Sequence, residues 1–399
     1  MTAKIEFFPV GNGDMTLITL ESGRTILIDV NIRKAADDEN DDETVDVAKL
    51  LRDRLERDAS GRLYVDAFLL SHPDEDHCRG LDRHFHLGRP EDWNKKDDQI
   101  LIREMWSSPI IFRRKKDVEN SLCEDADAWW GEARRRVKLY RSTRQKSSIG
   151  DGNRIQVLGE DKDGKTDDLT EILVKTDTQI TRIGGEVDGS FYGWLLAPHL
   201  VSKEEAENLA GKNHSSVVVR FGIQGGDQAD ACQFLTGGDA EVENWERVWA
   251  RNQNRRTRLS YDILLAPHHC SWHSLSYDSW SEKGEKAKVA PDARSALSQA
   301  RNSACLVASS NEIKDDENDP PCIRAKREYE DISRDATGTF LCSADECGDD
   351  VLFFEIDANG PTRGSKKKRS SGGGGSTVLV GGGASSPRMV DKKGGGRYA

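Results

Sequence analysis

The sequence contains no long apolar run. None of its stretches approaches about 18 consecutive apolar residues, which is the length that a membrane-spanning helix needs. Its first six residues lack the apolar core of a secretory signal peptide and predict a strand. The eight cysteines are scattered without a Cys-x-x-Cys pair, which indicates reduced thiols rather than disulfides. We therefore expect a cytoplasmic protein with no membrane partner.

An excess of positive charge is also missing. The 399 residues carry a net charge of −12, which argues against binding of nucleic acid by the whole surface. A single site can still take nucleic acid, because metal ions can dominate the local charge there. The content of 36% hydrophobic and 32% charged residues is typical of a globular protein with an elaborate surface.

Strand and helix signals alternate along most of the chain, which favours a layered α/β sandwich over a string of separate modules. Apolar runs predict three strands within residues 4–30 and further strands at 64–70, 215–221, 232–236, 262–266, 305–308 and 351–356. Residues 45–55 place apolar side chains at helical spacing, so a helix is expected before the fourth strand.

Two segments differ from this alternation. Residues 82–150 are highly charged and hold four tryptophans, so we expect a largely helical insertion in a domain that covers residues 1–362. The basic clusters there could guide a nucleic-acid strand or dock a protein partner; alternatively, the insertion is a solvated helical cap with core tryptophans. Residues 363–399 are rich in glycine, serine and basic residues and predict a flexible tail.

The most informative stretch is residues 72–77, directly after the apolar run 65–70. It places His72, Asp74, Asp76 and His77 on one short loop, which packing alone does not explain. Imidazole nitrogen and carboxylate oxygen are ligands for zinc, and manganese prefers more oxygen. His72 and Asp74 can face one ion, and Asp76 and His77 can face a second.

Four ligands on one loop do not complete two sites, so further ligands must come from distant strand ends. Asp239 follows an apolar strand and two glycines, and the pair His268 and His269 follows another strand. His214 precedes a third strand, and His199 competes with it for the same place. Side chains presented at strand ends suit a site on a rigid sheet edge.

Several segments of the sequence resemble the metallo-β-lactamase-like domain of the DNA-uptake competence protein ComEC. They occur in the same order as in that domain, over roughly residues 5–357. Residues 10–14 resemble its Gly-Gln-Gly-Asp segment with Asn12 in place of glutamine, and residues 70–77 resemble its Thr-His-x-Asp-x-Asp-His motif. Residues 213–219, 236–241 and 265–271 are similar to its later segments. The departures are Cys270, where a glycine is expected, and Gly238, an extra glycine before the aspartate.

The resemblance implies a four-layer αββα sandwich with two divalent ions, zinc or manganese. It implies that one ion is held by three residues and the other by three more, with Asp239 bridging. The first set is His72, Asp74 and His214, and the second is Asp76, His77 and His268. Two ions about 3.5–4 Å apart acidify a bridging water, which Asp76 would orient while His269 protonates the leaving oxygen.

We therefore expect a metal-dependent hydrolase, and first of all a phosphodiesterase that acts as a nuclease on a nucleic acid or nucleotide. Free-standing relatives of the resembled family include cytoplasmic hydrolases of bacterial antiviral defence. One alternative is hydrolysis of a small ester, lactone or nucleotide signal by the same centre. Another is a partner-binding subunit of a larger complex whose metals are structural; it predicts that Asp76→Asn retains function.

Overall fold

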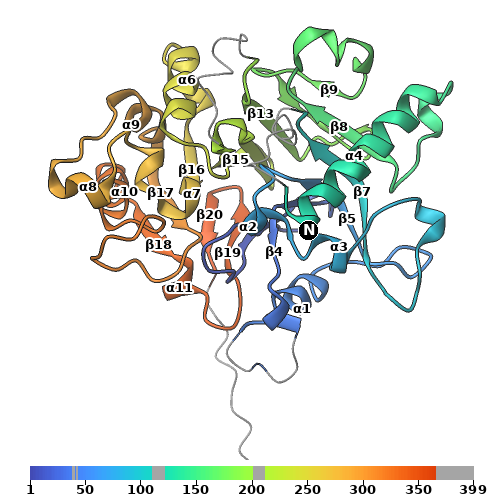
Figure 1. Ribbon diagram of the computed structural model, residues 1–399, viewed down its shortest axis with the longest axis horizontal. Helices are drawn as coiled ribbons and strands as arrows, with labels where there is room; N and C mark the ends of the chain where they lie inside the picture. The colour runs from blue at the N-terminus through green and yellow to red at the C-terminus, as the bar shows by residue number, and fades with distance from the viewer. Residues whose placement is uncertain (38–40, 42–43, 110–121, 201–211, 365–399) are drawn as a thin grey trace, which may run out of the picture. The chain divides into compact units, whose positions relative to one another are not determined.

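The computed structural model describes residues 1–37, 41, 44–109, 122–200 and 212–364, without the side chains of residues 212 and 214. The predicted tail therefore lies outside the described residues from residue 365 onward. Within the unit Met1–Gly364, two mixed β-sheets face each other and helices cover their outer faces (Figure 1). This is the αββα layer order that the resemblance implies.

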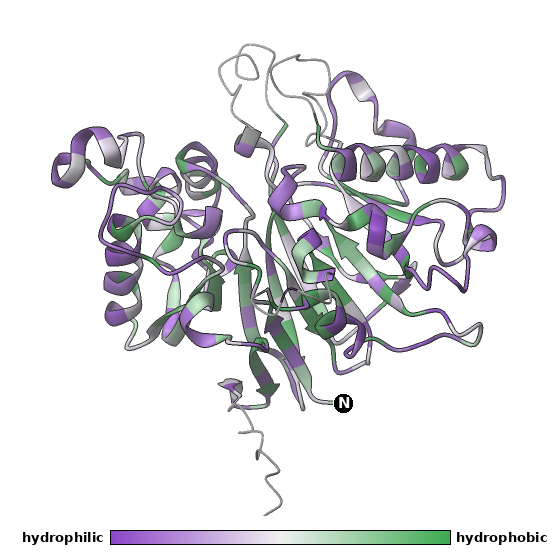
Figure 2. Ribbon diagram, turned by 60° about the horizontal axis from the view of Figure 1, so that its bottom comes forward, coloured by the Kyte–Doolittle hydropathy of each residue, from purple (hydrophilic) through white to green (hydrophobic). Residues whose placement is uncertain are grey.

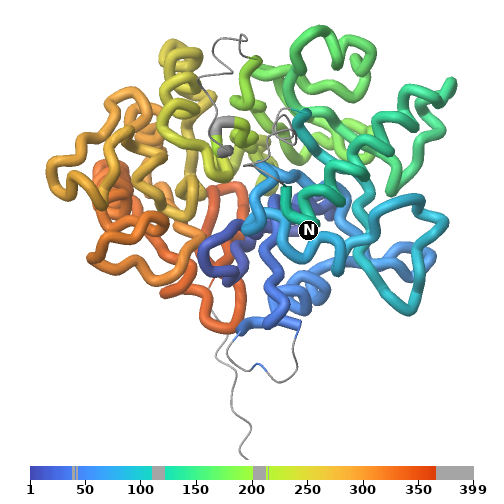
Figure 3. Tube along the Cα trace, in the orientation of Figure 1, coloured from blue at the N-terminus to red at the C-terminus, as the bar shows by residue number. Residues whose placement is uncertain are grey.

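The first sheet has the order β20-β19-β1-β2-β3-β5-β7-β8-β9, with β6 paired to β7. Its strands β3, β5, β7, β8 and β9 run parallel, and the others on the path are antiparallel. Their bounds are β1 (Ala3–Phe7), β2 (Thr16–Thr19), β3 (Thr25–Ile28), β5 (Tyr64–Leu69), β6 (Phe85–His86), β7 (Ile100–Ser107), β8 (Arg154–Leu158), β9 (Leu173–Val174), β19 (Leu352–Asp357) and β20 (Gly360–Arg363). Figure 3 shows β1 and β19, from opposite ends of the unit, side by side.

The second sheet has the order β10-β13-β14-β15-β16-β17-β18, and β15 to β18 run parallel. Its strands are β10 (Gln179–Ile180), β13 (Phe191–Ala197), β14 (Val218–Gly225), β15 (Gln228–Thr236), β16 (Tyr261–Leu265), β17 (Ala300–Ala308) and β18 (Thr339–Cys342). Strand β4 (Val30–Asn31) and the hairpin β11 (Arg182–Ile183) and β12 (Glu186–Val187) complete the strands described.

The α-helices are α1 (Val47–Arg52), α2 (Glu75–Cys78), α3 (Leu81–His84), α4 (Glu124–Ser142), α6 (Val242–Asn252), α7 (Pro267–Cys270), α8 (Trp280–Lys283), α9 (Pro291–Leu297), α10 (Ile323–Asp335) and α11 (Ser343–Glu346). None of those in the described part of the chain combines the length and the apolar character needed to cross a bilayer.

Alternation along the strands of the second sheet sends neighbouring side chains into two different cores, because successive residues of a strand point to opposite faces. Phe234 of β15 lies between the sheets, with its ring centroid 5.8 Å from that of Phe7 in β1. Leu235, the next residue, packs on the outer side in a cluster with Trp245 of α6 and Leu297 of α9. Figure 2 shows the apolar strands between helices that carry polar outer faces.

The segment 82–150 differs from the helical insertion that its composition predicts. Its residues 100–107 form β7, which lies between β5 and β8 inside the first sheet. The charges Arg103 and Glu104 conceal this strand in the sequence, but Arg103 pairs with Asp66 at 2.8 Å and Glu104 accepts the indole N–H of Trp106. The expected helix is present as α4, on the outer face of the sheet.

Two of the four tryptophans of this segment belong to the core. Trp129 of α4 is fully buried and its ring centroid lies 4.9 Å from that of Phe68 in β5. Trp106 is fully buried as well, on the side of the sheet that faces Phe191 of β13. Of the basic cluster at residues 134–136, Arg136 is fully buried against Glu132, so it is not available to a ligand.

Candidate metal centre

The histidines and carboxylates meet because parallel strands of each sheet end at a common edge. In the first sheet, Ile28 of β3 is in register with Leu69 of β5, so the residues that follow both strands emerge together. In the second sheet, Leu235 of β15 is in register with Leu264 of β16. The loops after these four strands carry the polar residues, and the two sheets bring both sets to one place.

Asp239 lies at the middle of the resulting cluster, with its side chain 4% exposed. Its Oδ1 lies 2.9 Å from Nε2 of His77 and 3.4 Å from Nε2 of His269. Its Oδ2 lies 3.5 Å from Nε2 of His72 and 3.4 Å from Nε2 of His268. Each oxygen of this one carboxylate therefore faces a different pair of imidazoles.

Two more carboxylates complete the side of the cluster that contains His269. Oδ1 of Asp14 lies 3.4 Å from Nδ1 of His269, and Oδ2 of Asp76 lies 3.3 Å from its Nε2. One ligand atom from each of Asp14, His77, Asp239 and His269 lies within 4.8 Å of the others, and all four residues are buried. Three carboxylates and two imidazoles thus surround a small volume.

The donor atoms of the cluster fit a divalent cation. Nε2 of His72 and Oδ1 of Asp14 are buried and have no hydrogen-bond partner, which is costly for polar atoms unless something else satisfies them. Nε2 of His77 also lies 3.2 Å from Nε2 of His269, so two ring nitrogens point at the same space. Nitrogen and carboxylate oxygen together are the ligand set of zinc and manganese.

The electrostatics of the cluster lead to the same conclusion. Burial lowers the pKa of His269, but Asp239, Asp14 and Asp76 outweigh it and raise this pKa to about 10. Burial likewise lowers the pKa of His77, and Asp239 and Asp29 raise it well above its ordinary value. Burial raises the pKa of Asp239, and the four imidazoles bring it well below its usual range. The carboxylates therefore create a buried site that demands positive charge, which divalent ions would provide.

Asp29 orients His77 from outside the cluster. Its carboxylate accepts the backbone N–H of Ser71 at 2.7 Å and the Ser71 hydroxyl at 2.5 Å, and its Oδ2 lies 2.8 Å from Nδ1 of His77. Asp29 is fully buried and has a φ of 55°, a conformation that costs energy in a residue other than glycine. Holding Nδ1 in this way directs Nε2 at Asp239, as carboxylates commonly do for ligating histidines.

The paired histidines occupy a left-handed turn. His268, His269 and Cys270 have φ values of 53°, 52° and 68°. Left-handed backbone costs roughly 1–2 kcal/mol per residue for side chains with a Cβ, so this turn stores strain at the site. It also explains the glycine expected in place of Cys270. The extra glycine at residue 238 is explained by close packing, since a Cβ there would lie 2.4 Å from Oγ of Ser71.

The structure brings together most of the residues proposed from the sequence: His72, Asp76, His77, Asp239, His268 and His269. It groups them differently, because His268 shares an oxygen of Asp239 with His72 rather than with His77. His269 lies among the candidate ligands; the sequence left open which histidine of the pair is the ligand and suggested His269 as the proton donor. Asp74 is the N-cap residue of α2 and is not in the group of four.

The remaining expectations concern His214 and its competitor His199. The side chain of His214 lies outside the described residues, although its backbone is in a short 3-10 helix, Lys212–Ser215. The charged groups around His199 are Arg251, Asp177 and Arg247, none of which belongs to the cluster.

Sequence reasoning missed Asp14 and Asp29 as functional residues. The sequence does hold a signal for Asp29, because this residue directly follows the apolar strand 25–28. The candidate ligands 72–77 follow the apolar strand β5 in the same way. Asp14 is the last residue of the segment 10–14. This segment resembles one in the ComEC domain, but no role was assigned to its aspartate. The backbone N of Gly13, the residue before it, lies 3.2 Å from Nδ1 of His269, and a Cβ on Gly13 would overlap Asn31.

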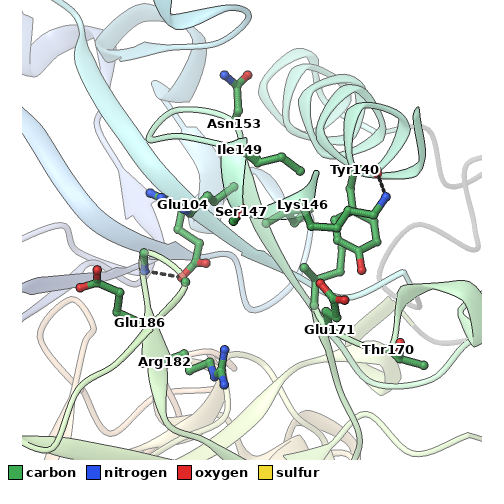
Figure 4. A pocket seen from close by; sticks show the side chains of 15 residues that line it. Glu104, Tyr140, Lys146, Ser147, Ile149, Asn153, Thr170, Glu171, Arg182 and Glu186 are labelled. Atoms are coloured by element: carbon green, nitrogen blue, oxygen red, sulfur yellow. Dashed lines mark hydrogen bonds between the residues drawn. The ribbon is translucent and has the colours of Figure 1, made fainter. Parts of the chain in front are cut away.

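A large hollow lies elsewhere in the molecule. It has a volume of about 720 Å³ and is lined by residues such as Glu104, Tyr140 and Arg182 (Figure 4). No residue of the histidine cluster lines it. The cluster therefore lies apart from this hollow.

Comparisons with known proteins give little further information. No protein-family model matches the sequence, and no curated protein matches it. A solved structure of a mutant CmlA beta-hydroxylase is similar with 10% identity and a TM-score of 0.33, over 85% of this chain and 52% of that one. The isothiocyanate hydrolase from Delia radicum gut bacteria is similar with 12% identity and a TM-score of 0.35, over 86% and 96% of the two chains. The chain thus spans about half the length of the first of these proteins.

Proposed function

We propose that the protein is a metal-dependent hydrolase, and more specifically a phosphodiesterase that cleaves nucleic acid with two divalent ions. The observation that carries this proposal is the position of Asp239. One oxygen faces His72 and His268, and the other faces His77 and His269. A carboxylate flanked in this way is suited to bridge two ions.

The residues of the chain would divide the work as follows. His72 and His268 would hold one ion on Oδ2 of Asp239. His77 and His269, with Asp14, would hold the other on Oδ1. Two such ions, when bound, would polarise a phosphoryl oxygen and lower the pKa of attacking water from about 15.7 toward about 7.

Asp76 is the best candidate for a catalytic residue that acts on the attacking water. Unlike Asp239 it is only partly buried, with 32% of its side chain exposed, and its Oδ2 lies 3.3 Å from Nε2 of His269. Burial raises the pKa of Asp76, but the His269 hydrogen bond and the charge of His77 bring it well below its usual range. It therefore stays ionised at neutral pH and can accept and hold a proton-bearing oxygen.

A second candidate is hydrolysis of a small ester, lactone or nucleotide by the same centre. The observation that favours it is that Arg135 and Arg136 are engaged in ion pairs within the fold. Both pair with Glu132, at 2.7 Å and 2.6 Å, which removes part of the basic surface expected to guide a strand.

The deciding experiment uses the full chain loaded with zinc or manganese. Metal content is measured first, and hydrolysis is then assayed on single- and double-stranded DNA and RNA, on bis-(p-nitrophenyl) phosphate and on p-nitrophenyl acetate. Asp239→Asn should lose bound metal and phosphodiester cleavage, whereas the partly exposed control Glu330→Gln should retain both. Cleavage of the acetate ester alone would favour the second candidate, and absence of bound metal would refute both.

A further inference from the structure

The outer face of the second sheet carries a positively charged hollow that no residue of the metal centre lines. Its volume is about 820 Å³, and we call it the arginine hollow. The residues used below are Tyr192, Trp194, Arg220, Arg255, Arg258 and Arg301. Asp230 is the single acidic residue among those described that line it. Four arginines against one aspartate stand out on a chain with a net charge of −12.

Arg220 forms a fixed base beneath the hollow. Its side chain is 4% exposed; Nη1 donates to the Tyr192 hydroxyl at 2.9 Å and Nη2 donates to the Thr257 carbonyl at 3.0 Å. The bond to Thr257 fastens the short 3-10 helix Arg256–Arg258 to the sheet. Buried Leu259 anchors the same segment on its other side. The loop that presents Arg255 and Arg258 is therefore held in place before any ligand binds.

Two arginines of the hollow, Arg255 and Arg258, have no acidic partner among the described residues. Arg301 is already paired with Asp262 at 3.0 Å, and Arg220 lies 3.4 Å from Asp230. Within the described ranges, no carboxylate oxygen lies within 4 Å of the side-chain nitrogens of Arg255 or Arg258. Their guanidinium groups are thus available to an external anion, and the planar fork of arginine matches phosphate particularly well.

Aromatic surface adjoins these cations. The guanidinium carbon of Arg258 lies 4.0 Å from the ring centroid of Trp194, so the two groups stack. Tyr192 and Trp194 alternate along β13 and share the outer face with the hollow. Stacking of a base on such a platform contributes about 1–3 kcal/mol and tolerates any base, because every base has a π face.

We propose that the arginine hollow binds single-stranded nucleic acid, with Arg255 and Arg258 on phosphates and a base against Trp194. This rests on the proposed function only for the identity of the substrate. Gln233 lines the hollow three residues, or about 10 Å, before β15 ends at Thr236, and Asp239 lies in the turn beyond that end. Binding there leaves the metal centre free, so the hollow is a second contact that retains the strand during cleavage.

The test measures binding without hydrolysis. Full-length protein in chelator is titrated into fluorescein-labelled oligothymidylate, and fluorescence anisotropy is recorded over a range of salt concentrations. Arg255→Gln with Arg258→Gln should weaken binding at least about ten-fold at low salt. It should also make the slope of log affinity against log salt shallower by about 1.4, since each phosphate contact on a single strand contributes about 0.7.

The matched control removes the same charge elsewhere. Lys314→Gln with Arg334→Gln alters two exposed cations outside the hollow and should leave affinity and slope near those of the wild type. Trp194→Phe, which keeps an aromatic face, should bind more tightly than Trp194→Leu. Thermal unfolding of each variant checks that the fold is intact.

Equal loss in the hollow and control variants would overturn the proposal, as would wild-type protein that does not bind the oligonucleotide. Competition by thymidine monophosphate at concentrations that match the strand would also overturn it, by identifying a mononucleotide site. The proposed function is tested separately. If metal-loaded wild-type protein binds the strand in this hollow but cleaves no phosphodiester, the nuclease proposal is refuted and the binding site is retained.

Discussion

Carboxylates hold the imidazole of His77 from both sides: Nδ1 lies 2.8 Å from Oδ2 of Asp29, and Nε2 lies 2.9 Å from Oδ1 of Asp239. The two acids come from different sheets. The orientation of the candidate ligand His77 therefore depends on how closely the two sheets lie to each other.

Replacing Asp29 by asparagine should weaken metal binding. Both oxygens of Asp29 face donors, so the amide nitrogen of Asn would meet either Ser71 or His77 instead of accepting from it. Loss of such an orienting partner typically costs about 10–100-fold in metal affinity. Titration with a competing chelator measures the change, and the exposed Asp92→Asn is the control. An unchanged affinity in Asp29→Asn would show that His77 does not need this carboxylate.

If two ions bind as proposed, His268→Gln and His269→Gln should lose different ones. His268 faces Oδ2 of Asp239 and His269 faces Oδ1, so each variant should retain the ion on the other oxygen. Metal content per chain, measured after dialysis, should fall by about one equivalent in either variant and by about two in the double variant. If either single variant loses all metal, the ions do not sit on separate oxygens, or they bind only together.

Glu132→Gln should destabilise the fold strongly. It leaves the fully buried Arg136 without its partner, and removal of one member of a buried ion pair costs about 3–5 kcal/mol. Burial already lowers the pKa of Arg136, which shows how little solvation its charge receives. Denaturant unfolding of the variant should be compared with Glu330→Gln, whose partly exposed pair with Lys326 should contribute under about 1 kcal/mol. Equal stability of the two variants would contradict a structural role for Arg136.

Cys270→Gly should be at least as stable as Cys270→Ala. Both variants remove the buried thiol, but only alanine keeps a Cβ at a φ of 68°. The left-handed conformation costs about 1–2 kcal/mol with a Cβ, and the greater flexibility of glycine in the unfolded chain offsets about 0.5–1 kcal/mol of this. We expect an advantage of up to about 1 kcal/mol for glycine in chemical denaturation. A more stable alanine variant would show that the turn is not strained at this residue.

Much of the strand framework could be predicted from the sequence because buried strands leave short apolar runs with polar ends. The runs at 64–70, 232–236 and 262–266 appear as β5, β15 and β16. Strand β7 could not be recognised in this way, because Arg103 and Glu104 interrupt its apolar pattern. Partners supplied by neighbouring strands, Asp66 for Arg103 and Gln156 for Glu104, make those charges compatible with a place inside the sheet.

For the candidate centre, the sequence by itself determined that His72, Asp76, His77, Asp239 and the pair at 268 and 269 would gather, since polar residues after parallel strands emerge at one edge. The tertiary structure alone decided which imidazoles share an oxygen of Asp239 and that Asp14 and Asp29 take part. Those relations depend on how closely two sheets approach and on a left-handed turn after β16. Neither leaves a periodic signal in the chain, because both arise from contacts between residues far apart in sequence.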